Sequence, residues 1–352
     1  MALLKKRDRH LGVDISPTAV KLVELNRSGH RLQVEAMAVE PLPEGSMEDQ
    51  NPTDTEAVAA AIKRALKQSG SRLRQAAVAV PTSSVITRII PMPLELGEEE
   101  IETNIQIEAA QYIPFPLEEI YLDFQVMGRS NTHKEMQDVM IVASRRENVD
   151  LREEVLSEAG LKAALVDVES YALENTFGQL STSLPDYGQE ARIALVDLGA
   201  TVTALYIFQN GELIYNREQP FGGDQLTQAI VDTYELPRDR AELAKRSGEL
   251  SEDYSSAVLA PYRRSAAEQI GHALQFFFSS SHHHDVDHIL LVGGGALVDA
   301  IDQTVTQRLK VPTTIGNPYA NMGISNRLSK RGLLKDAPLF AVACGLALRS
   351  FD

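Results

Sequence analysis

The chain has 352 residues, of which 43% are hydrophobic and 24% are charged, as is ordinary for a soluble globular protein. Its 34 Lys and Arg against 49 Asp and Glu give a net charge of −15, which excludes the basic footprint that a nucleic-acid partner requires. Cys344 is the single cysteine, which excludes an internal disulfide and fits a reducing compartment. The length predicts roughly two domains.

The sequence gives no sign of membrane insertion. No stretch approaches the ~20 apolar residues of a membrane span, and the start, MALLKKRDRH, lacks the apolar run of a signal peptide. We therefore expect a cytoplasmic protein. The basic residues of this start favour a solvated terminus, with contact to an anionic membrane surface as the alternative.

The first predicted unit has the order βββαβ. The stretch LGVDISPTAVKLVEL predicts two strands that meet at a corner of small residues just after Asp14. The helix that follows the third strand is capped by Thr53 or Asp54 and ended by Gly70. The predicted strands cover residues 11–15, 19–25, 31–39 and 76–80, and the helix covers 53–69.

Between residues 85 and 164 the pattern changes to a compact αβ unit that interrupts the first one. The first helix of this unit ends at Tyr112 and is followed directly by a rigid IPFP corner, which contains Phe115. We expect both aromatic side chains in the core of this unit, with a peptide groove as the alternative. The predicted strands cover 85–90, 121–127 and 138–143, and the helices cover 98–112 and 147–159.

A second copy of the first corner follows a predicted strand at 164–168 and a helix at 169–180. The stretch IALVDLGATVTALYIF again runs as a strand into an aspartate, Asp197, and returns as a strand. Asn210-Gly211 then predicts a hairpin to a further strand. Asp224 is expected to cap the helix after FGG.

The last part of the chain is mostly helical. Helices at 239–246 and 254–280, the second bent or delayed by Pro261, form a helical insert in the second copy. A strand at 288–292 then ends in Gly293-Gly294-Gly295-Ala296, and a helix at 297–309 is expected directly after it. Glycines let a flat ligand approach the backbone, and a helix start offers free N–H groups. A small apolar helix at 337–348 is expected to pack between the two copies.

The two aspartate corners predict a phosphate site. A carboxylate at the end of a buried strand, followed by a tight turn, can hold a metal-bound phosphate. Two such corners suggest two lobes that close on one nucleotide. The sequence has neither a G-x-G-x-x-G after its first strand nor a G-x-x-x-x-G-K-[ST], so Rossmann and P-loop sites are excluded.

In this order the motifs resemble those of the actin, Hsp70 and sugar-kinase ATPase superfamily. Residues 14–21 and 197–201 resemble its two phosphate motifs, 292–296 its adenosine motif, and 166–177 and 337–348 its connecting helices. The inserted unit is similar to the relocated subdomain of the division protein FtsA. More narrowly, VDISPTAVKLVEL, QIEAAQYIPFPLEEI, FGGDQLTQAI and HILLVGGGA resemble the PilM family of type IV pilus assembly proteins.

The resemblance implies an α/β, two-lobed actin-like (ribonuclease H-like) ATPase fold. Lobe 1 would comprise residues 1–84 and 165–190, with an FtsA-like insert at 85–164. Lobe 2 would comprise residues 191–230 and 287–352, with a helical subdomain at 231–286.

The resemblance also implies bound ATP or ADP with Mg²⁺, which Asp14 and Asp197 would hold directly or through water. Glu169 would orient or deprotonate the attacking water. The other expected nucleotide contacts are Ser16 and the Gly199, Ala200 and Thr201 turn through backbone N–H groups, Lys21 as a point charge, Gly222, Gly223 and Asp224 near the ribose and phosphates, Glu242 and Lys245 on the nucleoside, and Gly293, Gly294, Gly295 and Ala296 under the adenine and α-phosphate.

Each of these residues also has a structural interpretation. The two aspartates could be turn-formers, and Lys21 could be a solvated lysine on a strand edge. Glu242 and Lys245 could be an ordinary surface pair at i, i+3, and Glu169 a helix cap. The run His282-His283-His284 is expected to be a solvated loop rather than a metal cluster.

The corner after Asp14 departs from the superfamily pattern in a way that affects turnover. Many hydrolysing relatives have glycine where this chain has Ser16 followed by Pro17, which stiffens the loop. We therefore expect stable nucleotide binding with slow or no hydrolysis.

The resemblance implies a cytoplasmic, ATP-binding protein of the type IV pilus inner-membrane assembly platform. It would bind the N-terminal cytoplasmic segment of PilN, scaffold pilus assembly and twitching motility, and lie at the inner membrane through its partners; self-association stays open. One alternative is an FtsA-like filament-forming scaffold, which needs an amphipathic helix after the final ALRSFD. A sugar or acid kinase, which needs a catalytic base facing a second substrate, is the other.

Overall fold

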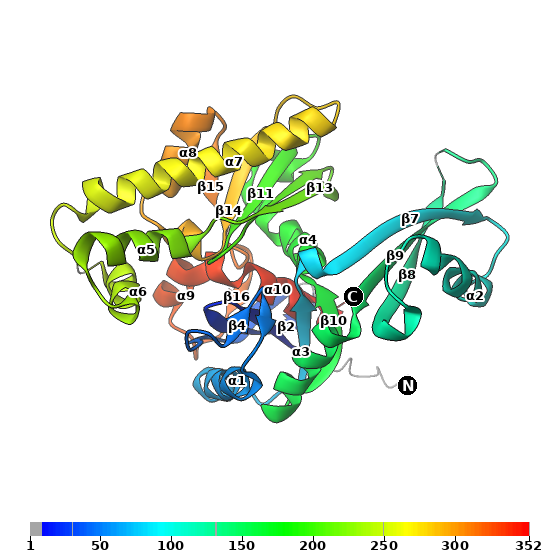
Figure 1. Ribbon diagram of the computed structural model, residues 1–352, viewed down its shortest axis with the longest axis horizontal. Helices are drawn as coiled ribbons and strands as arrows, with labels where there is room; N and C mark the ends of the chain where they lie inside the picture. Colours follow the sequence, from blue (N-terminus) through cyan, green and yellow to red (C-terminus); the bar gives the residue numbers. More distant parts are fainter. Residues whose placement is uncertain (1–8, 30, 131, 249, 352) are drawn as a thin grey trace.

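The computed structural model describes residues 9–29, 31–130, 132–248 and 250–351. Two large sheets face each other across the molecule, and a small third sheet projects to one side (Figure 1). Lobe 1 holds the six-stranded sheet, in the order β10-β6-β1-β2-β3-β16. Lobe 2 holds the five-stranded sheet, in the order β13-β12-β11-β14-β15.

The predicted order βββαβ of lobe 1 is confirmed. The first three strands form an antiparallel meander, and β6 and β10 add to it in parallel. The strands are β1 (Leu11–Ser16), β2 (Ala19–Ser28), β3 (Arg31–Pro41), β6 (Gln75–Val80), β10 (Lys162–Val168) and β16 (Gly323–Ile324), and a separate small pair is formed by β4 (Met47–Glu48) and β5 (Asn51–Pro52).

Helix α1 (Thr55–Ser69) forms where its sequence signals predict it. The Asp54 side chain caps it by accepting a hydrogen bond from the backbone N–H of Ala57 at 2.9 Å, and Gly70 ends it in a left-handed conformation with φ 67°. Val58 and Ile62 are fully buried against the sheet. Helix α3 (Arg146–Glu158) packs beside α1, and its Val155 belongs to the same core cluster.

The third sheet has its own core. Strands β7 (Val85–Pro93), β9 (Met136–Arg145) and β8 (Ile120–Arg129) pair antiparallel in the order β7-β9-β8, and α2 (Glu98–Glu108) packs on one face. Phe115 is partly buried against this core, as predicted. The prediction for Tyr112 was wrong, because its side chain is 37% exposed: the α-helix ends at Glu108, and the irregular turn that follows carries Tyr112 outward.

Lobe 2 repeats the meander of lobe 1. The hairpin at Asn210-Gly211 is confirmed, with φ of 54° and 84° at its two residues. The strands are β11 (Arg192–Leu198), β12 (Thr203–Gln209), β13 (Glu212–Gln219), β14 (His288–Val292) and β15 (Thr313–Ile315), and the helices are α5 (Gly223–Tyr234), α6 (Arg238–Ser247), α7 (Ala260–Ser280) and α8 (Ile301–Leu309). Helix α9 (Lys330–Asp336) packs on lobe 1 instead, because its Leu333 shares a core cluster with Val23 and Val34 of that sheet. Across the described ranges, no helix is long and apolar enough to cross a membrane.

Two predicted helix starts in lobe 2 were wrong. Asp224 is not the cap of α5; Gly222 is, and its N–H is satisfied by the Gln225 side chain at 2.7 Å. The long helix predicted to follow the three glycines is also interrupted. A short 3-10 turn at Gly294–Leu297 comes first, and α8 begins only after Ala300, whose φ of 53° turns the chain.

The two lobes meet on two crossing helices, α4 (Glu169–Leu180) and α10 (Ala341–Leu348). Every residue of α10 is buried, as predicted for a helix between the lobes. At Gly345 the backbones come so close that an added Cβ would lie 1.7 Å from the carbonyl oxygen of Ala172 in α4. At Gly12 an added Cβ would lie 1.9 Å from the carbonyl oxygen of Ala343. The junction is therefore made by backbone packed against backbone.

We predict that Gly345→Ala lowers the free energy of unfolding by about 2 kcal/mol or more, because the added methyl group forces α10 and α4 apart. Gly178→Ala in α4 is the matched control, since an added Cβ there meets no atom within 4 Å. The control is expected to keep or slightly raise stability, because alanine favours helix. Urea unfolding measures both, and equal stabilities would contradict the prediction.

Candidate functional site

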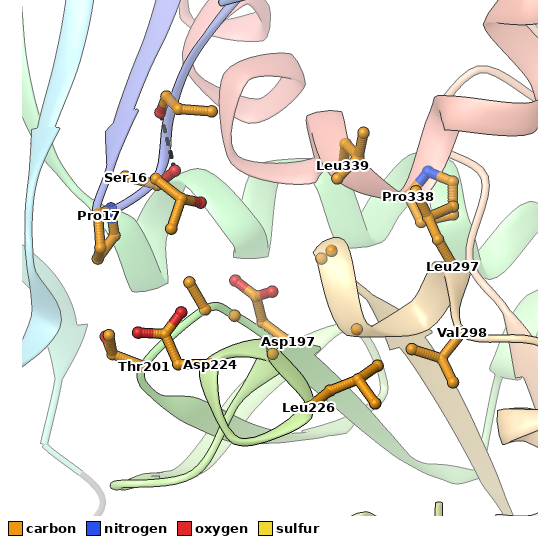
Figure 2. A pocket seen from close by; sticks show the side chains of 18 of the residues that line it. Ser16, Pro17, Asp197, Thr201, Asp224, Leu226, Leu297, Val298, Pro338 and Leu339 are labelled. Atoms are coloured by element: carbon orange, nitrogen blue, oxygen red, sulfur yellow. Dashed lines mark hydrogen bonds between the residues drawn. The ribbon is translucent and has the colours of Figure 1, made fainter. Parts of the chain in front are cut away.

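A cleft of about 680 Å³ lies between the lobes and gathers the predicted site residues from both (Figure 2). Two predicted residues do not line it. Gly222 packs behind the turn at Gly199 and Ala200, and Ala296 is buried in the core of lobe 2. The predicted residues that line the cleft are Asp14, Ser16, Lys21, Glu169, Asp197, Gly199, Ala200, Thr201, Gly223, Asp224, Glu242, Lys245, Gly293, Gly294 and Gly295.

The corner of lobe 1 places an ion pair at the cleft. Asp14 and Lys21 are direct partners in the β1–β2 register, so their side chains leave the sheet together. The Lys21 Nζ donates to Asp14 Oδ2 at 2.7 Å and to Ser16 Oγ at 3.0 Å. The side chain of Lys21 is 13% exposed and that of Asp14 is 5% exposed. Lys21 is thus not a solvated strand-edge lysine.

The corner of lobe 2 depends on the glycines that follow β14. Gly293 has φ 81°, and an added Cβ would lie 2.1 Å from Asp197 Oδ1, so only glycine lets this backbone lie against the carboxylate. The turn after Asp197 is closed by a bond from the Gly199 N–H to the Val202 carbonyl at 3.0 Å. Within the described chain, the N–H groups of Ala200 and Thr201 in this turn donate to no protein acceptor.

Burial controls the charges in the cleft. Burial raises the pKa of Asp197 from 3.8 to about 6, with Lys21 lowering it and Asp14 raising it. Burial also raises the pKa of Glu169 from 4.5 to about 8, reinforced by Asp14 and opposed by Arg152. Glu169 therefore carries a proton at neutral pH, and it is the first residue of α4 and not its cap, which is Val168.

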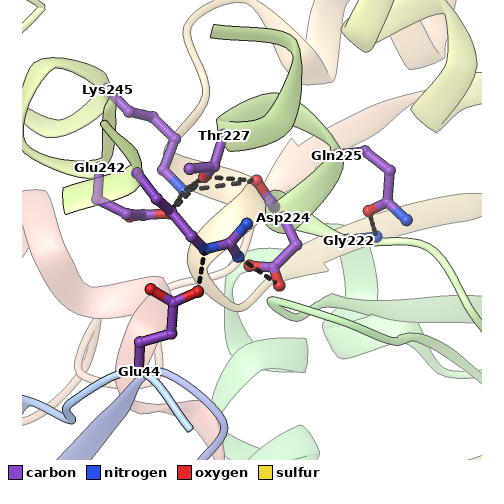
Figure 3. Close-up of polar contacts among 9 residues, drawn as sticks. Glu44, Gly222, Asp224, Gln225, Thr227, Glu242 and Lys245 are labelled. Atoms are coloured by element: carbon purple, nitrogen blue, oxygen red, sulfur yellow. Dashed lines mark hydrogen bonds and ion pairs between the residues drawn. The ribbon is translucent and has the colours of Figure 1, made fainter. Parts of the chain in front are cut away.

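The opposite wall holds a second buried pair (Figure 3). Lys245 Nζ donates to Glu242 Oε1 at 2.7 Å and to Thr227 Oγ1 at 2.6 Å, and the two charged side chains are 21% and 26% exposed. Burial alone would raise the pKa of Glu242, but the charge of Lys245 and its hydrogen bond outweigh burial and leave the pKa lowered. The pair lines the cleft and is not an ordinary surface pair.

Arg238 connects the two lobes beside the cleft. Its guanidinium lies 2.9 Å from Asp224 Oδ2 in lobe 2 and 3.4 Å from Glu44 Oε1 in the loop after β3 of lobe 1 (Figure 3). The other oxygen of Asp224 is buried without a hydrogen-bond partner. Asp224, predicted from sequence as a site residue, therefore lines the cleft and keeps one unsatisfied oxygen beneath its wall.

The sequence did not reveal several residues of the cleft. Gln50 reaches it from a loop in which Asp49 and Gln50 have φ of 46° and 64°. The fully buried Arg152 holds this loop by donating to the Gln50 carbonyl at 2.9 Å. No local motif predicts such a loop. The other lining residues without a sequence signal include Tyr206, Glu218, Leu226, Tyr254, Leu297, Val298, Pro338 and Leu339.

The cleft fits a nucleotide that carries a divalent cation. Asp14, Asp197 and Glu218 are among the acidic residues that line it, so a bare triphosphate would face several carboxylates. A cation held between Asp14 and Asp197 would remove that repulsion, and the N–H groups of Ala200 and Thr201 suit a phosphate. Within the described ranges, no group of three or more His, Cys, Asp and Glu is placed to hold a metal ion, either in the cleft or at the histidine run at 282–284.

Comparison with known proteins gives a family match over almost the whole chain. The model of the family described as type IV pilus assembly protein PilM matches residues 12–351. A solved PilM-PilN type IV pilus biogenesis complex contains a chain that is 28% identical, with a TM-score of 0.81, over 98% of this chain and 99% of that one. The ethanolamine utilization protein EutJ of Carboxydothermus hydrogenoformans, 16% identical, shares the fold with a TM-score of 0.59 over 96% and 89% of the two chains. The predicted two-lobed, actin-like fold is confirmed.

Curated relatives show the link to FtsA. The cell division protein FtsA of Bacillus subtilis is 24% identical over 265 residues, and that of Helicobacter pylori is 25% identical over 250 residues. These matches cover 69% and 63% of this chain, and they span 58% and 48% of the two relatives. The likeness to FtsA therefore concerns the fold.

We predict that the free energy of unfolding falls as pH rises through the range set by Glu169. Its pKa is raised on folding from 4.5 to about 8, so the stabilisation is complete below pH 4.5 and is lost as pH approaches 8. Glu169→Gln removes this titration and is expected to flatten the decline between pH 6 and 8, which should be about 1.4 kcal/mol per pH unit.

The exposed Glu118 gives the matched control, Glu118→Gln, which should leave the pH profile unchanged. Urea unfolding across this pH range measures all three proteins. A wild-type profile that is flat, or a Glu169→Gln profile that still declines like wild type, would contradict the assignment.

Proposed function

Since the chain belongs to the family of type IV pilus assembly proteins PilM, we propose that it serves pilus assembly as a nucleotide-binding scaffold. The observation that carries the nucleotide part is the cleft, in which two aspartate corners from opposite lobes face one space with glycine backbone at Gly293 and free N–H groups at Ala200 and Thr201. The ligand is ATP or ADP with Mg²⁺ between Asp14 and Asp197.

We assign the phosphates to the two corners and the nucleoside to the opposite wall. Lys21 gives the phosphates a positive charge once Mg²⁺ takes over the carboxylate of Asp14. Glu242 and Lys245 hold the ribose side, where Asp224 also lines the cleft. The apolar side chains of Leu226, Leu297, Val298 and Leu339 give the base a place to stack.

The nucleotide is held and is turned over slowly. Glu169 carries the proton that a base would have to accept, because burial raises its pKa to about 8. The Ser16 hydroxyl donates to the Ala19 carbonyl at 2.8 Å, which ties the corner to itself. Both features support a structural role for the nucleotide, in which it fixes the angle between the lobes.

The partner is an extended segment of PilN, proposed from the solved PilM-PilN complex that this chain resembles. Strand β10 is the outer strand of the lobe 1 sheet, and it lies between that lobe and the sheet of β7, β9 and β8 (Figure 1). Its Leu165 is 37% exposed, and Ile89 on β7 is 61% exposed. A peptide strand paired with β10 would cover both. The protein would then lie at the inner membrane through this partner.

Removing the Asp14 carboxylate is expected to weaken Mg²⁺-ATP binding at least about tenfold, because the cation loses a ligand. In EDTA the difference should shrink or reverse, since Asp14→Ala also removes a charge that repels phosphate and frees Lys21. Calorimetry with ATP, with and without Mg²⁺, measures the affinities of wild type and Asp14→Ala. Mass analysis of any nucleotide that co-purifies with wild type is a second, independent measurement of nucleotide binding.

The control is Asp232→Ala, which removes an exposed carboxylate from α5. It should bind as wild type does. If Asp14→Ala and wild type bind Mg²⁺-ATP equally, the assignment of this corner is wrong.

A synthetic N-terminal PilN peptide is expected to bind the full chain with micromolar affinity, and Leu165→Asp is expected to abolish the binding because it places a charge at the apolar centre of the β10 edge. Leu243→Asp, at a 58% exposed leucine of α6 in lobe 2, is the matched control and should bind normally. No heat of binding for wild type at high micromolar peptide would refute the proposal.

A further inference from the structure

A basic hollow lies at the end of lobe 1, away from the cleft. It occupies about 430 Å³ between the C-terminal ends of α1 and α3, which lie together at the bottom of Figure 1. Three cations line it, Lys63, Lys67 and Arg74, together with the small or apolar residues Leu66, Ala159 and Gly160. A concentration of positive charge is unexpected in a chain with a net charge of −15.

The charges of these cations are not compensated inside the protein; the Arg74 guanidinium donates to an uncharged group, the Leu73 carbonyl, at 2.8 Å. The side chains of Lys63, Lys67 and Arg74 are exposed, and none of them has a carboxylate within ion-pair distance in the part of the chain that the structure describes. Arg64, the neighbour of Lys63, does pair with Glu40. The end of α1 explains one lysine, because cations stabilise a helix C-terminus. Arg74 lies beyond the end of α1, so the helix C-terminus does not explain why a cation stands at this position.

A fourth cation lies at the same end of the sheet. Lys162, the exposed first residue of β10, donates its backbone N–H to the Arg74 carbonyl at 2.8 Å.

We propose that this basic end of lobe 1, formed by Lys63, Lys67, Arg74 and Lys162, docks on the anionic phospholipid headgroups of a bilayer. An acidic protein is repelled by an anionic surface except where its cations gather, so the patch selects one orientation. The hollow has room for a headgroup phosphate among the three lining cations. Nucleic acid is disfavoured because the patch is small and the rest of the chain is acidic.

The position of the patch is consistent with the proposed binding of a PilN segment to β10, and the link between patch and peptide rests on that proposal. Lys162 begins β10, the strand assigned to the PilN segment, so a peptide paired with β10 has one end at the patch. A partner anchored in the bilayer and the bilayer itself would then meet the protein at the same end. Each contact raises the effective concentration for the other.

The experiment is vesicle flotation with the full chain and no peptide. Wild type is expected to float with phosphatidylcholine vesicles that contain phosphatidylglycerol, less so at high salt, and not with phosphatidylcholine alone. The variant Lys63→Glu/Lys67→Glu/Arg74→Glu is expected to lose binding by at least about a hundredfold, since each cation near the surface contributes about fivefold and the new carboxylates are repelled as well.

The matched control changes net charge equally at exposed arginines elsewhere, as Arg129→Glu/Arg264→Glu/Arg327→Glu, and should keep most of the binding. The milder Lys63→Gln/Lys67→Gln, with a melting curve, guards against misfolding and should give an intermediate loss. Asp14→Ala should float as wild type does, which separates this test from that of the nucleotide site.

Five results would overturn the proposal. The first three are no flotation of wild type, equal loss in the patch and control variants, and equal binding to neutral vesicles. Tighter binding to polyglutamate than to the anionic vesicles would also overturn it, in favour of an acidic protein segment. Inorganic phosphate that binds to the hollow without any vesicle binding would likewise reject the lipid.

Discussion

The structure depends on the close contact of α10 with β1 and α4. Gly12 and Gly345 remove the side chains that would separate these elements, so backbone packs on backbone. The core around this contact contains residues of both sheets, such as Ala77 of lobe 1 and Leu195 of lobe 2. The lobes are therefore held at one spacing. At that spacing the ends of β1 and β11 face one cleft, close enough for the charge of Asp14 to act on Asp197.

The close approach of these carboxyl groups makes the free energy of folding less favourable. Glu169 and Asp197 are buried carboxyl groups whose pKa values rise, which means that folding disfavours their charged forms. Lys21 offsets part of this cost at Asp14, and Arg152 acts on Glu169 from the loop side. Apolar residues in these places would give a more stable protein. The carboxyl groups make sense as parts of a site that a cation completes.

The sequence predicts which residues line the cleft where a residue sits in a repeated or regular pattern. Asp14 and Asp197 were found because two strand-turn-strand corners repeat, and the three glycines because they follow a buried strand. Gln50 was missed because its loop has no periodicity and is fixed by Arg152, about a hundred residues later in the chain. The start of α5 was misplaced because Gly222 packs against Ala200, a tertiary contact that outweighs the local preference of Asp224 for a cap.

The two corners have diverged into different tasks, although the duplication gave them one plan. In lobe 1 the turn is stiffened by Pro17 and tied by the Ser16 hydroxyl, and its lysine neutralises Asp14. In lobe 2 the turn has no such lysine, and the N–H groups of Ala200 and Thr201 are left for a ligand. Lobe 1 thus supplies a carboxylate, Asp14, whose charge Lys21 already compensates, and lobe 2 supplies backbone N–H donors. A ligand that bridges the two gains contacts from both lobes without requiring either corner to move, which favours stable binding of the nucleotide that we propose for this cleft.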